Sequence, residues 1–214
     1  MQKMFIGSVG ALVAAGLMAG SAMAADIQCD GKKLIIVDKL SAASKAKAVY
    51  VSKDQGCGIT KGTSVTTDTS VISASLDVNY GGSTSGTWDA PLGSSDGQKG
   101  WLVNKGTVAK YVNKGAPGTG STKVAVVKPG KLLKIVGKDL GDSPIDIFGA
   151  GDLTGGSPDV TTVFTVTNDG QTNRHCGGLD CSYKLIAGDS GAKLVCKAPV
   201  AASCPASPSG AFID

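Results

Sequence analysis

Residues 174–205 read RHCGGLDCSYKLIAGDSGAKLVCKAPVAASCP, and this Cys-rich tail segment is the part of the sequence that says most about the fold. Two short apolar runs, 183–186 and 193–196, are separated by the turn-forming series Ala-Gly-Asp-Ser-Gly-Ala. Turn residues between two strand-like runs predict a β-hairpin. The segment also holds four of the six cysteines, Cys176, Cys181, Cys196 and Cys204. We therefore predict a C-terminal hairpin that is pinned by disulfides.

The remaining cysteines are Cys29 and Cys57, so the total is even. An even number in an exported chain argues for disulfides formed in an oxidising compartment. Sequence alone does not choose among the many ways of pairing six cysteines. The pairing we expect is Cys29 with Cys57, Cys181 with Cys196, and Cys176 with Cys204. Zinc is the alternative use of this tail, but the closest cysteines have four residues between them instead of the usual two, so we expect no metal site.

Residues 1–24 are predicted to be a signal peptide. Lys3 supplies the positive start, residues 5–18 form an apolar run, and Ala-Met-Ala at 22–24 provides a small-residue cleavage site. The apolar run is short for a membrane span, and polar residues follow it. We expect cleavage to leave residues 25–214 as a single exported domain without a membrane span, an uncleaved anchor being the alternative.

The composition favours strands over helices. Glutamate is absent, so every acid is an aspartate, which prefers caps and turns to helix interiors. The 31 glycines point the same way. The net charge of +4 is mild, and the lysines are scattered along the sequence without aromatic residues interleaved. A nucleic-acid surface is therefore not expected.

Short apolar runs separated by turn residues recur along residues 25–214. Residues 71–80 show the period-two alternation of a half-buried strand, with Ala74, Leu76 and Val78 at the apolar positions. Many short strands with almost no helix predict an all-β fold, an antiparallel Ig-like β-sandwich. Pro-Gly within 128–131 favours a bend between sheets over a simple hairpin there. The strands expected before the tail are 33–38, 47–52, 71–80, 101–104, 107–112, 124–127, 132–136, 145–148 and 160–167.

The chain contains three short motifs, VYVSKD, VVKPGKLLK and KAPVAASCP. Together they resemble a group of secreted, β-rich bacterial proteins in which the pattern occurs once or in tandem. That group has no established activity. The resemblance implies an extracellular module of unknown role, and it transfers no catalytic residues. Cys181 and Cys196 form an additional pair relative to the pattern.

Two fragments of the tail are similar to segments of trypsin-like serine proteases: Gly-Asp-Ser-Gly at 188–191, and Arg174-His175-Cys176. A catalytic triad needs serine and histidine within hydrogen-bond reach and a carboxylate to orient the histidine. In those proteases the two segments lie far apart in the sequence, whereas Ser190 follows His175 closely here. A hairpin turn is the simpler interpretation of Gly-Asp-Ser-Gly. We expect no catalytic residues.

Calcium is a further alternative, because aspartates recur in glycine-rich loops and hard cations prefer oxygen ligands. No loop matches the calcium-loop motif, so we expect no cofactor and assign no calcium ligands. The aspartates concerned are Asp142, Asp146, Asp152, Asp159 and Asp169.

Trp88 and Trp101 are the rings best suited to stack on a sugar or another small ligand. The alternative is that both are core or loop anchors, because large apolar side chains are usually buried. The sequence thus favours a non-enzymatic extracellular or cell-surface module with a structural, adhesive or protein-interaction role. The second hypothesis is a carbohydrate- or small-ligand-binding domain. The partner would be an unknown protein or glycan at the cell surface, with self-assembly as a further option.

Overall fold

The computed structural model describes most of the chain downstream of the predicted signal peptide. The described residues are 25–39, 45–55, 57, 65–80, 85–115, 120–138, 147, 158–187 and 191–205. The signal-peptide prediction lies outside them, as does most of the strand expected at 145–148. Within the described part no helix has the length and apolar character that a membrane crossing would need.

Strands dominate the described residues, with one short 3-10 turn, η2 (Thr69–Val71), between β3 and β4. Their apolar residues alternate with polar ones, so each strand buries one face. The strands are β1 (Ala25–Gln28), β2 (Gly31–Lys39), β3 (Lys47–Ser52), β4 (Ile72–Asn79), β5 (Ser85–Ala90), β6 (Lys99–Asn104), β7 (Val108–Asn113), β8 (Thr122–Lys128), β9 (Leu132–Lys138), β10 (Asp159–Asn168), β11 (Gln171–Ile186) and β12 (Gly191–Val200).

All of these strands belong to one continuous sheet, in the order β5-β4-β10-β11-β12-β2-β3-β9-β8-β7-β6, with β1 added in parallel to β11. The other pairs of strands are antiparallel. β11 makes the sheet fold over, because its first part pairs with β10 and its last part with β12. A register shift lies between Asp180 and Cys181, where the strand passes from one pairing to the other.

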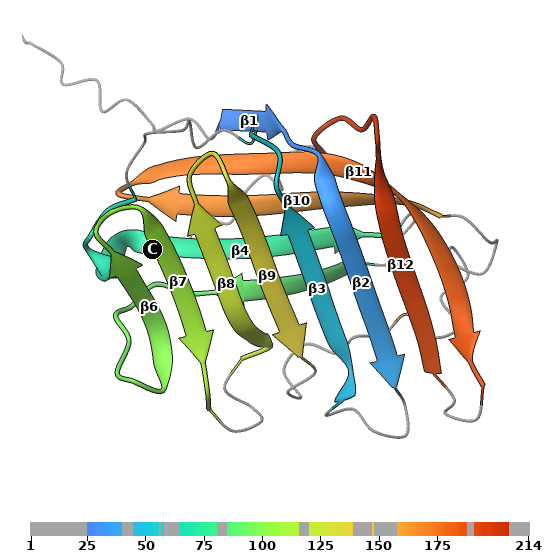
Figure 1. The fold of residues 1–214 in the computed structure, drawn as a ribbon, viewed down its shortest axis with the longest axis horizontal. Helices are drawn as coiled ribbons and strands as arrows, with labels where there is room; N and C mark the ends of the chain where they lie inside the picture. The colour runs from blue at the N-terminus through green and yellow to red at the C-terminus, as the bar shows by residue number, and fades with distance from the viewer. Residues whose placement is uncertain are drawn as a thin grey trace, which may run out of the picture.

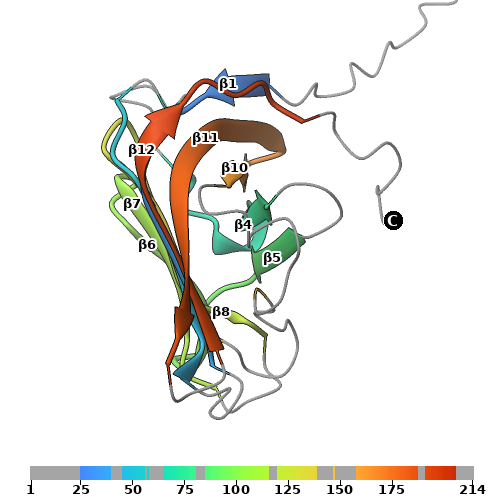
Figure 2. The ribbon, with the colours of Figure 1, turned by 90° about the vertical axis from the view of Figure 1, so that its right-hand side faces the viewer.

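The folded sheet forms two layers (Figure 1, Figure 2). The first layer contains β6, β7, β8, β9, β3, β2, β12 and the end of β11. The second contains β5, β4, β10 and the beginning of β11, and its strands run across those of the first layer (Figure 1). β5 contacts β8, so the sheet nearly closes on itself. The structure therefore confirms the all-β class, as a single folded sheet.

The core lies between the layers. Tyr50 of β3 stacks on Phe164 of β10, with ring centroids 6.0 Å apart. Trp88 of β5 lies against Gly137 of β9, where an added Cβ would overlap the indole ring. Because these contacts join strands of different layers, aromatic residues fill the centre of a core that is otherwise mostly aliphatic.

The expectation of a bend between sheets at residues 128–131 is wrong. β8 and β9 are adjacent antiparallel strands, so Pro129-Gly130 closes a hairpin and does not bend the chain between sheets. The Lys131 amide donates to the Lys128 carbonyl at 3.0 Å, and Gly130 takes a positive φ of 59°. Glycine tolerates this conformation, which lets a Pro-Gly turn serve a tight hairpin.

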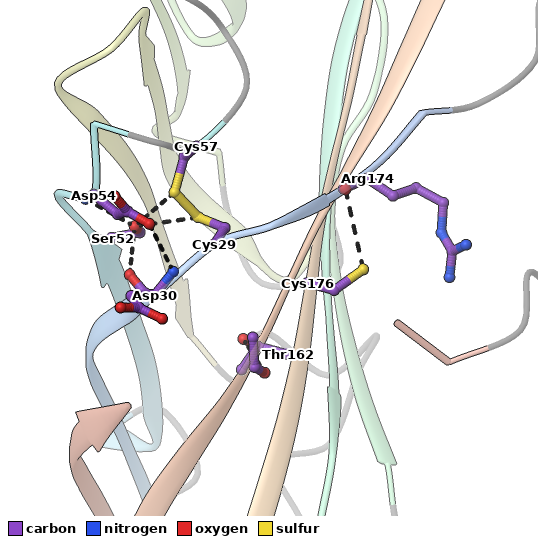
Figure 3. The surroundings of a disulfide bond; sticks show 9 residues. Cys29, Asp30, Ser52, Asp54, Cys57, Thr162, Arg174 and Cys176 are labelled. Atoms are coloured by element: carbon purple, nitrogen blue, oxygen red, sulfur yellow. Dashed lines mark hydrogen bonds between the residues drawn. A yellow bond between two sulfur atoms is a disulfide. The ribbon is translucent and has the colours of Figure 1, made fainter. Parts of the chain in front are cut away.

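Three disulfides link Cys29 with Cys57, Cys176 with Cys204, and Cys181 with Cys196, which are the pairings expected from the sequence. The third joins β11 directly to β12, so the C-terminal hairpin is pinned as predicted. Beside the first, the Ser52 hydroxyl donates to the Asp30 carbonyl at 2.8 Å, and Asp54 accepts from the Asp30 amide at 3.0 Å (Figure 3). Three disulfides indicate an oxidising, non-cytoplasmic environment.

Candidate interaction face

The two tryptophans singled out as ligand-stacking candidates lie in the core. Trp88 is 1% exposed and Trp101 is fully buried. The Trp101 indole N–H donates to the Pro91 carbonyl at 2.8 Å, and its ring packs against Tyr111. Neither ring is placed to stack on a ligand at the surface, so both act as core anchors.

The other sequence candidates for catalysis and metal binding lie in different parts of the fold. His175 is fully buried, and Ser190 lies outside the described residues. All six cysteines are in disulfides, which leaves no thiolate to bind zinc. Of the aspartates considered for calcium, Asp159 and Asp169 are described and exposed, whereas the others lie outside the described residues.

The outer side of the first layer carries a stripe of half-buried aliphatic side chains. The stripe crosses six neighbouring strands, and each member is the direct cross-strand partner of the next. Inward-facing neighbours such as Ile36, Ala48 and Ile135 are fully buried, so the stripe faces solvent. Its members, in order across β7, β8, β9, β3, β2 and β12, are Val112, Val124, Val136, Val49, Ile35 and Val195.

Lysines form a row on each side of this stripe. On one side, the paired positions from β7 to β2 are Lys110, Val126, Lys134, Val51 and Lys33. On the other side, the paired positions from β9 to β11 are Lys138, Lys47, Val37, Lys193 and Lys184. Lys197 of β12 is also exposed. We call this surface the lysine face, made of the aliphatic stripe and the eight lysines Lys33, Lys47, Lys110, Lys134, Lys138, Lys184, Lys193 and Lys197.

The lysine face is not neutralised by its neighbours. Among the residues that the structure describes, none of the eight ammonium groups lies in an ion pair, in contrast to Arg174, which pairs with Asp26 at 2.8 Å. Like charges held this close together repel one another and lower stability unless an anion compensates them. The face therefore has unused positive charge.

One end of the lysine face is hollowed. A depression of about 500 Å³ lies over β2, β12 and β11, open to solvent. Four lysines line the depression together with Ser182, and Asp180 is the acidic residue in its lining. Its aliphatic floor includes Ile35 and Val195. The lysines are Lys33, Lys184, Lys193 and Lys197.

The outer side of the second layer has the opposite character. β4, β5 and β10 contain no lysine, and their outward positions are mostly serine, threonine, asparagine and aspartate. Asp77 accepts a hydrogen bond from the Thr87 hydroxyl at 2.8 Å. Burial, and secondarily the charge of Asp77, raises the pKa of Asp89. The positive charge of the sheet is thus concentrated on the first layer.

A smaller hollow of about 290 Å³ lies between β5, β6 and β7. Asp89 and Lys99 both line it, so it holds one charge of each sign. It therefore has no net charge with which to select a charged ligand, and the lysine face remains the stronger candidate site.

Sequence reasoning missed the lysine face because the lysines look scattered along the chain. The signal was present in KLIIVDK, KAVYVSK, KLLKIVGK and GAKLVCK, where lysines alternate with valine or isoleucine at even spacing. An even spacing places residues on one face of a strand. Only the strand order, however, shows that these runs lie side by side.

Comparisons with protein-family models, with curated proteins and with solved structures found no match to this chain.

Proposed function

We propose that this protein is an exported, non-enzymatic module that binds an anionic partner at the cell surface through its lysine face. The observation that carries the proposal is the arrangement of eight lysines without ion pairs around a half-buried aliphatic stripe, on one face of a sheet whose other outer face lacks lysine. A charge excess of this kind attracts partners of opposite charge.

Export is supported by two independent observations. The three disulfides place the folded chain in an oxidising environment. The pattern of residues 1–24 is that of a cleavable signal peptide. Both agree with export from the cytoplasm, to the periplasm or to the outside of the cell.

A binding role is favoured over catalysis by the position of the one histidine. His175 is fully buried, so it is out of reach of a substrate at the surface. A carbohydrate-binding role through Trp88 and Trp101 has no support, because both rings are in the core.

For the fold, we propose a sandwich in a broad sense, made by folding one sheet. Two packed layers around a shared core agree with the sandwich that the sequence predicts. An Ig-like sandwich consists of two sheets, whereas here β11 runs through both layers. In this fold the lysine face is the outer, solvent-facing side of the larger layer.

The proposal is tested by adsorption of the mature protein to isolated cell envelopes of the producing organism. The face variant carries Lys33→Gln, Lys47→Gln, Lys184→Gln and Lys193→Gln. The control variant makes the same substitution at four exposed lysines outside the strands, Lys45, Lys105, Lys114 and Lys131, and so has the same net charge. We expect the wild type and the control variant to adsorb and the face variant to remain in solution. Equal adsorption of both variants would refute a role for the lysine face.

A further inference from the structure

We infer that the partner of the lysine face is a linear acidic polysaccharide, a polymer of carboxylated or sulfated sugars; this rests on the function proposed above. The inference uses three properties of the face: the arrangement of its charges in rows, the use of lysine alone, and the form of its apolar stripe.

The charges form lines, not a single cluster. The row from Lys138 to Lys184 covers four steps between neighbouring strands, or about 19 Å at the usual strand spacing. The row from Lys110 to Lys33 covers the same number of steps. The two rows are four residues apart along a strand, or about 13 Å. A single phosphate or a small organic acid would contact only a few of these lysines, whereas an extended polyanion laid across the strands contacts a whole row.

The cations on this face are all lysines, and the one arginine of the chain lies elsewhere, paired with Asp26. An ammonium group is a hydrated point charge on a flexible stem, whereas a guanidinium group selects carboxylate or phosphate geometry by a rigid fork. Rows of ammonium groups thus match the repeating charge of a polymer without fixing its register.

The stripe between the rows favours a polysaccharide over a membrane. Its members are half-buried valine and isoleucine, so they form a shallow apolar floor that does not protrude. Peripheral membrane surfaces insert Trp, Phe or Leu side chains among the acyl chains. On the lysine face, sugar C–H groups would lie on the aliphatic floor while the acidic groups reach the lysines on either side.

Nucleic acid and a second copy of the chain fit less well. Single-stranded nucleic acid is bound by stacking bases on aromatic rings, and the stripe contains none. A second copy would have to supply acids from its lysine-free face, where Asp77, Asp89 and Asp159 are the outward carboxylates of β4, β5 and β10. Three carboxylates do not balance eight lysines.

The test is a calorimetric titration of mature, oxidised protein with polygalacturonate at low and at physiological salt, with dextran as the neutral reference. We expect binding to polygalacturonate that weakens steeply with salt, because bound counterions are released, and no binding to dextran. The face variant should bind at least about tenfold more weakly, while the control variant, with lysines outside the strands replaced, stays within about twofold of wild type. Arginine at the same four face positions should retain the binding, because charge and stem length persist.

Two further titrations separate the outcomes. Vesicles of phosphatidylglycerol and phosphatidylcholine, and duplex DNA, are offered at the same concentration of anionic groups. If either binds more tightly than polygalacturonate and the face variant loses that binding, the polysaccharide inference fails while the proposed function stands. If no probe binds in a way that depends on the face lysines, both fail. Near-ultraviolet circular dichroism confirms that each variant is folded.

Discussion

His175 is the only histidine of the chain, and it is enclosed by the core. It pairs across strands with Phe164 of β10 and with Ile27 of β1. Neither of its ring nitrogens has a hydrogen-bond partner among the described residues. Burial lowers the pKa of the His175 imidazole from the ordinary 6.5 to about 4, because the charged form would lose its hydration.

This residue makes stability depend on pH. The unfolded chain takes up a proton at His175 as the pH falls through 6.5, whereas the folded chain stays neutral there until about pH 4. The free energy of unfolding should therefore fall between these values, by about 3 kcal/mol in total at 1.36 kcal/mol per pKa unit. Urea unfolding of the wild type and of His175→Leu across this range measures the effect. The leucine variant should lack this loss, and an unchanged pH dependence would contradict the assignment to His175.

At the scale of elements, the tail shows what the sequence could and could not predict. The hairpin was predictable because turn residues are a local signal, and disulfides were predictable from the even number of cysteines, although the sequence alone did not determine their pairing. The length of β11 was not, since Cys176 and Gly177 look like loop residues yet lie within the strand. Gly177 is required there because a Cβ would overlap the Cys29 carbonyl, a contact that tertiary structure alone creates. The segment that the sequence marked as a C-terminal tail thus forms two strands in the interior of the sheet, β11 and β12.

The two disulfides of the tail should differ in whether they protect residues 201–205 from proteolysis. β11 and β12 pair with neighbours on both sides, so hydrogen bonds within the sheet hold these strands in addition to the disulfides. Residues 201–205 instead lie beyond the last strand, held by the Cys176–Cys204 disulfide and by the bonds from Gln28 to Ala202 and from Arg174 to Pro205.

Replacing both Cys176 and Cys204 by alanine should release residues 201–205 to cleavage by proteinase K and lower the unfolding free energy by about 3–4 kcal/mol. The matched variant lacks Cys181 and Cys196, which close a shorter loop of 15 residues. It should lose about 3 kcal/mol but gain no new cleavage site. Mass spectrometry of the digests decides, and identical cleavage patterns would contradict this division of roles.

At the scale of the whole molecule, the lysine face depends on strand order. The alternation within β2, β3, β9 and β12 could be predicted, because period two is a local property. Which strands are neighbours could not, because the pairings of β3 with β9 and of β2 with β12 join strands far apart in the sequence, and no local pattern encodes them. The chain could therefore be predicted as all-β and disulfide-bonded, whereas the lysine face could not.

The sheet has two terminal strands, β5 and β6, and the edge of β6 is partly covered. The Trp101 amide donates to the Gly93 carbonyl at 2.9 Å, and the Ser95 amide donates to the Trp101 carbonyl at 3.1 Å. Gly100 lies beneath this covering segment with φ of 128°, and a Cβ there would overlap the Ser94 carbonyl. Uncovered edge strands promote association between chains.

Gly100→Ala should displace residues 93–96, lower the unfolding free energy by about 1–3 kcal/mol and cause association. Gly97→Ala is the control, since Gly97 also has a positive φ but nothing lies within 4 Å of an added Cβ. The control should lose stability through backbone strain and yet scatter light like the wild type. Association of both variants, or of neither, would argue against the covering role.

β11 also determines how the molecule carries mechanical load. β1 pairs with β11 through Asp26 and Arg174, and the Cys176–Cys204 disulfide fastens the other end of the described chain to the same strand. A pulling force applied between Ala25 and Pro205 thus passes through β1, a short part of β11 and one covalent bond. The remaining strands lie outside this path and are shielded until β1 shears from β11. A tether that holds both ends of the molecule would therefore leave the lysine face undistorted under tension.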